Sequence, residues 1–167
     1  MGTDNGILIY NYRTDRYEQP ATDFPTDVRT MALQGDTLWI GALNGLYTYQ
    51  LQNRKLSPLD TKRNGLPHNT IYSIIRTGDN QIYVGTYNGL CRYIASNGKF
   101  EKIPLPVNSS QSNLFVNSLL EDTGRQCIWI GTEGYLFQYF PSTGQMKQTE
   151  AFHNNSIKSL ALDGNGD

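Results

Sequence analysis

Side chains suited to acid–base chemistry are sparse, with two histidines among 167 residues. His68 lies in the motif Asn64-Gly-Leu-Pro-His-Asn69, and a general base there would need a nucleophile or a carboxylate within hydrogen-bond reach. The sequence supplies no such partner, and loop residues beside proline usually serve the turn. His153 is no better placed. We therefore expect no catalytic residue in this chain.

Metal and disulfide chemistry are not indicated either. Cys91 and Cys127 lie in different parts of the chain with no CxxC or Cys/His spacing, which predicts two buried thiols. Asp163-Gly-Asn-Gly-Asp167 imitates the opening of a calcium loop, in which oxygen ligands alternate along the chain. It also aligns with turns elsewhere in the chain, and a turn is the interpretation we adopt. No metal and no cofactor are expected.

Recognition chemistry is better represented. Aromatic rings beside amides and a carboxylate could stack on a sugar and hydrogen-bond to it. Asn and Gly also satisfy the geometry of tight turns, so a purely structural role stays open for each residue taken singly. The candidate ligand-binding residues are Asn44, His68, Asn69, Tyr87, Asn88, Asn113, Glu133 and Tyr135.

These residues lie in a sequence repeat that predicts the strands and turns around them. Thr37-Leu-Trp-Ile-Gly-Ala-Leu-Asn-Gly-Leu-Tyr-Thr-Tyr49 recurs at Gln81–Tyr93 and at Cys127–Tyr139, and a shortened copy opens the chain at Gly2–Tyr10. The aligned glycines are 39, 44 and 46 residues apart, a period that indicates a repeat architecture. These glycines are Gly2, Gly41, Gly85 and Gly131.

Each repeat unit predicts four strands. The first leads with a β-branched residue and has a small hydroxyl residue at its third position, which suits a crowded inner strand. The second contains Trp39, Tyr83 or Trp129 and is apolar on both faces, as in a sheet packed between two similar sheets. A hairpin follows, in which Gly45 and Gly89 are expected to take positive φ. The third and fourth strands end the unit.

Four strands in a unit of roughly 40 to 50 residues are typical of a β-propeller blade. We therefore predict an all-β fold, a β-propeller fragment of four-stranded antiparallel blades with about three complete blades and partial blades at both ends. The predicted blades span 28–59, 71–105 and 116–149. The second half of a blade is expected at 1–19, with a strand at Ile7–Tyr10, and the start of a further blade at 157–167, with a strand at Ile157–Leu162. On this interpretation the chain is a piece of a longer protein.

The predicted strand order places two sets of loops on one face of the disc, which is the default binding surface. One set precedes the inner strands and includes 60–69 and 108–113. The other set consists of the hairpin tips between the second and third strands, and these tips vary most between the copies. Trp39 and Trp129 are instead assigned to the packing between blades.

Charge and hydropathy exclude several classes of partner. The formal net charge is −1, so there is no basic field to attract nucleic acid or an anionic membrane surface. No run of about 18 apolar residues exists, and the first residues do not form a signal peptide. We expect no nucleic-acid partner and no membrane contact by this segment.

The repeat, with its Trp-Ile-Gly-Thr (Trp129–Thr132) and Asn-Gly-Leu (Asn88–Leu90) motifs, resembles that of the two-component regulator propeller family. Asn64-Gly-Leu-Pro-His-Asn69 resembles the lead-in of that family to its inner strand. The third copy departs from the pattern, because Gly134 comes one residue early and Tyr135 replaces the second glycine. The shape of that turn is left open.

The resemblance implies a function for the parent protein. In hybrid two-component sensors of bacteria, such propellers form the periplasmic part that detects glycans or their fragments, ahead of a transmembrane helix and a histidine kinase. The expected role is therefore a non-catalytic sensing segment in the periplasm, part of a sensor anchored in the inner membrane. Expected partners are an oligosaccharide or glycan fragment, other blades of the parent chain, and a second copy of the parent sensor.

Two alternatives remain open at this point. The segment could be a structural or dimerisation propeller that transmits a signal while another domain binds ligand. It could also belong to a propeller enzyme acting on glycans, although no convincing acid/base pair is present. The chain contains no kinase motif, so kinase activity would lie elsewhere in the parent protein.

Overall fold

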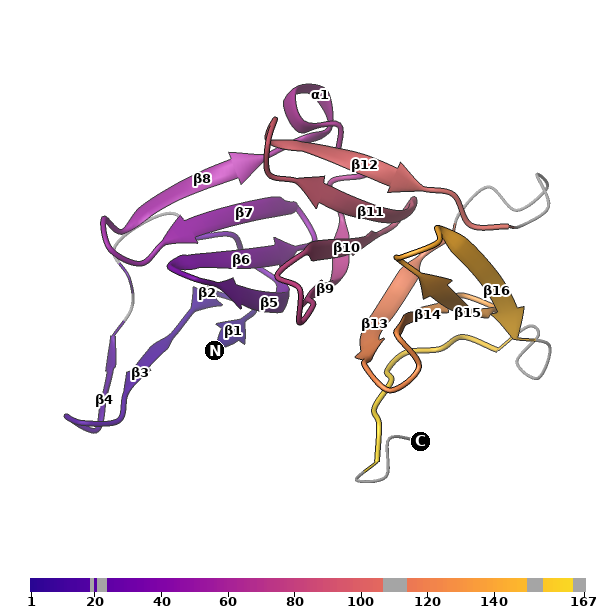
Figure 1. Ribbon diagram of the computed structural model, residues 1–167. Coiled ribbons are helices and arrows are strands. Elements are labelled where there is room, and N and C mark those ends of the chain that lie inside the picture. Colours follow the sequence, from indigo (N-terminus) through magenta and orange to yellow (C-terminus); the bar gives the residue numbers. More distant parts are fainter. Residues whose placement is uncertain (19, 21–23, 107–113, 150–154, 164–167) are drawn as a thin grey trace.

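Each full copy of the repeat folds into one four-stranded antiparallel sheet, with neighbouring strands in chain order. The computed structural model describes residues 1–18, 20, 24–106, 114–149 and 155–163. The three sheets stand side by side as blades, and their inner strands β5, β9 and β13 are in contact, which confirms the predicted all-β propeller fold (Figure 1). The strands are β5 (Val28–Gln34), β6 (Thr37–Ala42), β7 (Gly45–Gln50) and β8 (Lys55–Leu59) in blade 1; β9 (Ile71–Arg76), β10 (Ile82–Thr86), β11 (Gly89–Ile94) and β12 (Lys99–Ile103) in blade 2; and β13 (Val116–Asp122), β14 (Cys127–Thr132), β15 (Leu136–Phe140) and β16 (Gln145–Thr149) in blade 3.

The N-terminal part forms two short hairpins. β1 (Gly2–Thr3) pairs with β2 (Gly6–Ile7), and β3 (Ile9–Asn11) pairs with β4 (Arg16–Glu18). The strand predicted at Ile7–Tyr10 is therefore divided at Leu8. The Leu8 N–H bonds to the Met1 carbonyl oxygen at 2.9 Å beside the first hairpin, whereas Ile9 pairs with Glu18 in the second.

The inner strand predicted at Ile157–Leu162 is not formed. In this region Ser156 makes an isolated bridge to Glu133, and the Ile157 N–H bonds to the Thr132 carbonyl oxygen at 2.9 Å. A strand needs a hydrogen-bonded neighbour along its length. Among the described residues, this segment has such pairing only at its start.

Close contact between blades explains the spacing of the repeated glycines. A Cβ atom added at Gly41 would lie 2.5 Å from Cγ2 of Ile71, the first residue of the next inner strand. At Gly85 the corresponding neighbour is Val116, with its Cγ1 at 2.6 Å. Gly2 and Gly131 make the same approach to Val28 and Ile157. The glycine of one blade thus makes room for the β-branched residue that begins the next.

The small hydroxyl residue of the inner strand also joins neighbouring blades. Thr30 Oγ1 accepts a hydrogen bond from the Ile74 N–H at 3.1 Å, and the Ser73 hydroxyl donates to the Val116 carbonyl oxygen at 3.2 Å. Ser118 is the counterpart in blade 3, and its buried hydroxyl has no hydrogen-bond partner among the described residues. The predicted crowding at this position is confirmed.

Hydrophobic cores fill the two junctions between blades. Trp39 of blade 1 lies in one core with Ile74, Val84 and Phe100 of blade 2. The second core joins Tyr83 of blade 2 to residues of blade 3 that include Ile130 and Phe137. β10 is buried along its whole length, as expected for a sheet packed between two others.

The prediction for the hairpin glycines is correct at one position and wrong at the other. Gly89 has φ of 100°, whereas Gly45 does not take positive φ. A Cβ atom at Gly45 would lie 2.9 Å from the Tyr47 ring, so a close side chain explains that glycine. In the divergent third hairpin, Gly134 takes φ of 107°. A short helix, α1 (Thr61–Asn64), was not expected; Asp60 caps its N-terminus and Gly65 its C-terminus.

Candidate functional site

The loops before the inner strands and the hairpin tips meet on one face of the propeller, as predicted. In blade 2 the Tyr87 N–H at the hairpin tip bonds to the Thr70 carbonyl oxygen at 3.0 Å. In blade 3 the Glu133 N–H bonds to the Phe115 carbonyl oxygen at 3.3 Å. We call this surface the hairpin face.

Four half-buried rings gather on the hairpin face at the junction of blades 2 and 3. The centroids of His68 and Tyr87 lie 4.8 Å apart at 32°, and Phe115 meets Tyr87 edge-on at 4.2 Å. Tyr72 packs against the other side of Phe115 at 6.0 Å. We call His68, Tyr72, Tyr87 and Phe115 the aromatic cluster. It unites two predicted candidates with two residues that the sequence did not single out.

A β-bulge places Tyr72 at this surface. The pairing of β9 with β10 shifts register between Ser73 and Ile71, which leaves Tyr72 as the extra residue. Bulges redirect side chains near sheet ends. The same shift recurs at Arg29 in blade 1 and Asn117 in blade 3, so it belongs to the repeat. Regular alternation along the strand does not reveal it, which is why Tyr72 was missed.

Polar groups surround the aromatic cluster. Nδ1 of His68 accepts a hydrogen bond from the Thr70 N–H at 3.0 Å, so in the neutral ring Nε2 carries the proton and can donate. Asn69 and Asn88 are exposed next to His68 and Tyr87 in the chain. The site therefore combines apolar ring faces with amide and imidazole groups, an arrangement suited to binding rather than to proton transfer.

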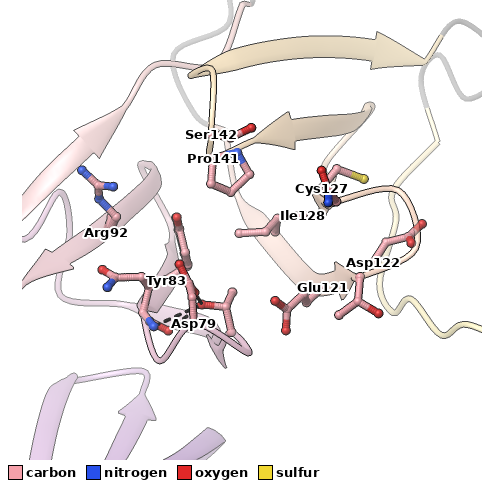
Figure 2. A pocket seen from close by; sticks show the side chains of 13 residues that line it. Asp79, Tyr83, Arg92, Glu121, Asp122, Cys127, Ile128, Pro141 and Ser142 are labelled. Atoms are coloured by element: carbon pink, nitrogen blue, oxygen red, sulfur yellow. Dashed lines mark hydrogen bonds between the residues drawn. The ribbon is translucent and has the colours of Figure 1, made fainter.

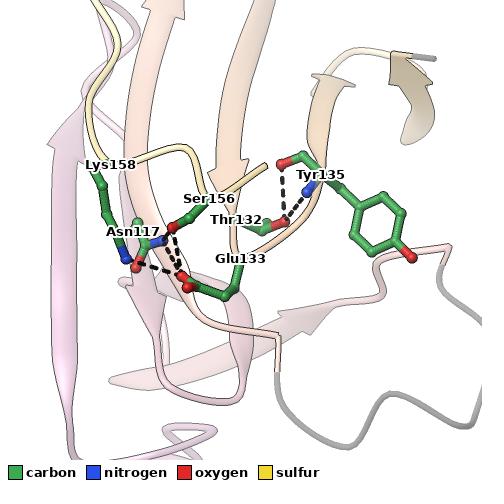
Figure 3. A network of polar contacts seen from close by, with 6 residues as sticks. All are labelled: Asn117, Thr132, Glu133, Tyr135, Ser156 and Lys158. Carbon is green, nitrogen blue, oxygen red and sulfur yellow. Dashed lines mark hydrogen bonds and ion pairs between the residues drawn. The ribbon is translucent and has the colours of Figure 1, made fainter. Parts of the chain in front are cut away.

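The Glu133 carboxylate is already hydrogen-bonded to other residues of this chain, unlike a carboxylate that is free to bind a ligand. Its Oε2 atom accepts hydrogen bonds from the Ser156 hydroxyl at 2.7 Å, from Asn117 Nδ2 at 3.1 Å and from Lys158 Nζ at 3.0 Å (Figure 3). These donors lower the pKa of Glu133 to about 2. The network ties the hairpin of blade 3 to the segment that follows that blade.

Acid should weaken this network. The pKa of Glu133 is lowered from 4.5, first by Ser156 and then by Asn117 and Lys158. A carboxyl group whose pKa is lower in the folded state stabilises the fold above its unfolded pKa, and loses that contribution as pH falls toward its folded pKa. We expect the urea midpoint of the wild type to fall more steeply between pH 4.5 and 2 than that of Glu133→Gln. Parallel pH profiles would contradict this role.

The remaining candidates do not join the aromatic cluster. Asn44 is exposed on blade 1, where its Oδ1 accepts from the Tyr47 hydroxyl at 3.5 Å. The Tyr135 ring lies 5.8 Å from Phe137, and its N–H bonds to Thr132 Oγ1 at 3.2 Å. Asn113 lies outside the described residues.

The structure also bears on the other chemical assignments. Both thiols are free and buried, as predicted, and burial raises the pKa of Cys91 and Cys127. Trp39 is 2% exposed, as predicted for inter-blade packing, whereas the same prediction is wrong for Trp129, which is half-buried and outside the hydrophobic cores of the described residues. Within the described ranges, no group of three or more His, Cys, Asp or Glu side chains could hold a metal.

No helix in the part that the structure describes is long and apolar enough to cross a bilayer. The calcium-like segment Asp163–Asp167 is described only at its first residue.

Comparison with known proteins shows which family this repeat resembles. Residues 65–88, which include His68 and Tyr87, match the family described as two component regulator propeller. The chain is 28% identical over 149 residues to histidine kinase P4 of Formosa agariphila, a match that covers 81% of this chain and 11% of that protein.

Solved structures extend the comparison. Two crystal structures from B. thetaiotaomicron are 90% identical, with TM-scores of 0.95 over the whole chain. One is the extracellular domain of a putative one component system and the other that of a putative hybrid two component system, and the match covers 23% and 22% of them. A further extracellular domain of a putative hybrid two component system, 20% identical over 95% of this chain and 21% of its own, shares the fold with a TM-score of 0.69. The chain thus spans less than a quarter of these structures and about a tenth of the kinase. The match at residues 65–88 thus shows the two-component regulator propeller repeat in this chain.

Proposed function

We propose that this chain is a non-catalytic, ligand-sensing propeller segment of a periplasmic sensor in a hybrid two-component system, anchored in the inner membrane. The similarity to extracellular domains of putative two-component systems supports this setting. The ligand we propose is a glycan or an oligosaccharide. Kinase activity would belong to another part of the parent protein, and a second copy of that parent would complete a homodimeric sensor.

The aromatic cluster carries the proposal for the ligand. His68 and Tyr87 present ring surface that is only half-buried, while Phe115 contacts Tyr87 edge-on and Tyr72 packs against Phe115. A sugar has apolar C–H faces and a rim of hydroxyl groups. Ring faces bordered by Asn69, Asn88 and the His68 imidazole match both parts of such a ligand, and loops held by a rigid scaffold are common positions for binding residues.

Replacing Tyr87 with alanine is expected to weaken oligosaccharide binding roughly tenfold, because an aromatic packing contact contributes about 0.5–1.5 kcal/mol. Isothermal titration calorimetry of the complete protein against a panel of neutral and acidic oligosaccharides would measure this change. Leu43→Ala is the matched control, since Leu43 occupies the same hairpin position in blade 1 and lies away from the aromatic cluster. Absence of binding to every oligosaccharide would count heavily against the proposed function.

A structural or dimerisation role is the second candidate. Its supporting observation is that Glu133, a predicted ligand residue, already accepts hydrogen bonds from three donors within the chain. On this alternative the segment transmits a signal while another domain binds the ligand. Unchanged affinity in both Tyr87→Ala and Glu133→Ala, in a protein that does bind oligosaccharide, would favour it.

A further inference from the structure

Blade 2 departs from the repeat on the face opposite the hairpin face. The aromatic residue of the second strand is Trp39 in blade 1, Trp129 in blade 3 and Tyr83 in blade 2. Its partner across the ladder is a neutral residue in blades 1 and 3 but an arginine in blade 2. These partners are Thr48, Gln138 and Arg92.

The two tryptophans are anchored in the same manner. The Trp39 indole N–H donates to Gln34 Oε1 at 3.1 Å, and the Trp129 indole N–H donates to Asp122 Oδ2 at 3.1 Å. Gln34 and Asp122 both end their inner strands. The counterpart in blade 2 is Thr77, whose hydroxyl bonds to Asp79 instead. Blade 2 therefore lacks both the indole and its anchor.

A cleft of about 620 Å³ lies between blades 2 and 3 at this position (Figure 2). At the preceding junction Trp39 packs edge-on against Tyr93 at 4.7 Å. The smaller Tyr83 ring, which meets Tyr139 at 6.2 Å, lines the cleft together with Ile128. The volume falls within the roughly 300–1,000 Å³ that is usual for small-molecule sites.

Arg92 brings a cationic hydrogen-bond donor to the cleft. Its Nη2 atom bonds to Glu101 Oε2 at 2.7 Å, which fixes the guanidinium group. Its Nε atom is buried and has no hydrogen-bond partner among the described residues. That atom has no exposed surface, so a ligand in the cleft would bond instead to other N–H groups of the guanidinium, since the Arg92 side chain is 32% exposed.

Acceptors line the other parts of the cleft. Both carboxylate oxygens of Glu121 accept from the Gly78 N–H at 2.9 Å, which positions the group across the junction and leaves further lone pairs available. Asp79 belongs to the blade 2 wall, and Asp122 is already paired with Arg125. Three carboxylates against one lining arginine disfavour an anionic ligand.

We propose that this cleft binds a neutral saccharide unit. Its hydroxyl groups would accept a hydrogen bond from an exposed N–H of the Arg92 guanidinium and donate to Glu121 and Asp79. The proposal rests on the proposed function for its class of ligand, but it uses different residues on the opposite face. Binding here would bridge blades 2 and 3, so a ligand would stabilise their junction.

The main test substitution gives blade 2 the tryptophan that blades 1 and 3 have at this position. Saturation-transfer NMR and calorimetry would measure binding of glucose, galactose, mannose, maltose and cellobiose to the complete protein, with glucuronate and galacturonate as anionic probes. We expect a neutral probe to bind, Tyr83→Trp to abolish that binding by filling the cleft, and Arg92→Gln to weaken it by up to about tenfold. Gln138→Thr is the matched control in blade 3 and should bind as the wild type does. Thermal unfolding would verify that each variant is folded.

The outcomes separate the two proposals. Binding that survives Tyr83→Trp and Arg92→Gln but is lost in Tyr87→Ala would overturn the cleft proposal and leave the proposed function standing. The reverse pattern would support the cleft and remove the aromatic cluster as the site. Preference for the uronates, or no binding of any neutral probe, would overturn the cleft proposal.

Discussion

Gly85→Ala is expected to lower the free energy of unfolding by about 3 kcal/mol, at the upper end of the cost of overpacking a core. The added Cβ atom would lie 2.6 Å from Val116 Cγ1 and 2.7 Å from the Val116 carbonyl oxygen, and would also meet the Ser73 hydroxyl. The carbonyl belongs to the backbone of the next blade and cannot rotate away. The new methyl group would therefore force blades 2 and 3 apart and disturb the bond from Ser73 to Val116.

Gly124→Ala is the matched control for this effect. A Cβ atom at Gly124 would meet only Asp122 Oδ1 at 3.5 Å, an ordinary contact, and the residue is exposed in a turn of blade 3. Urea unfolding of the complete protein, followed by tryptophan fluorescence, would compare the two variants. Equal stabilities for Gly85→Ala and Gly124→Ala would refute the account of the glycine spacing given above.

Asp122→Ala is expected to cost about 2 kcal/mol, because it removes a buried acceptor shared by several donors. The Asp122 side chain is 2% exposed. It accepts from the Arg125 N–H at 2.8 Å, from the Arg125 guanidinium at 3.0 Å and from the Trp129 indole at 3.1 Å. Alanine would leave the indole N–H without its acceptor.

Asp122→Asn distinguishes hydrogen bonding from charge at this position. Asparagine keeps an acceptor for one donor and should lose less stability than alanine. The bond from the Arg125 N–H is the main cause that lowers the pKa of Asp122 below 3.8. The stabilisation should therefore be present above that pH and be lost as pH falls further. An alanine variant as stable as the wild type at neutral pH would be inconsistent with this role, and denaturant titrations at several pH values would show it.

The described packing explains how a repeat protein can carry variable surfaces. Glycine, β-branched and hydroxyl positions couple each blade to the next, while hairpin tips and strand-connecting turns are free to differ. Both proposed sites lie at the junction of blades 2 and 3, one on each face. Ligand contact at either would act on the same pair of blades.

The repeat, the strands of the three complete blades and most of the residues packed between them can be predicted from the sequence alone. This was possible because glycine spacing and doubly apolar strands are local patterns that directly reflect blade geometry. It also placed His68 and Tyr87 on one face, since strand order decides which loops share an edge. It erred at Gly45, where a neighbouring ring explains the glycine, and at Leu8, after which the pairing passes to the second hairpin. It also erred at Ile157–Leu162, which is paired only at its start among the described residues.

Which surface residues meet depends on how the blades pack in three dimensions. A bulge places Tyr72 in the aromatic cluster, and Phe115 belongs to the neighbouring blade. The pattern of a single repeat therefore predicts neither residue as part of the cluster. Glu133 resembled a free carboxylate until the contacts from Asn117, Ser156 and Lys158 appeared. The cleft beside Arg92 depends on the size difference between Tyr83 and the tryptophans of the other blades. Such features arise from contacts between residues distant in the chain, and a pattern read along the chain does not contain them.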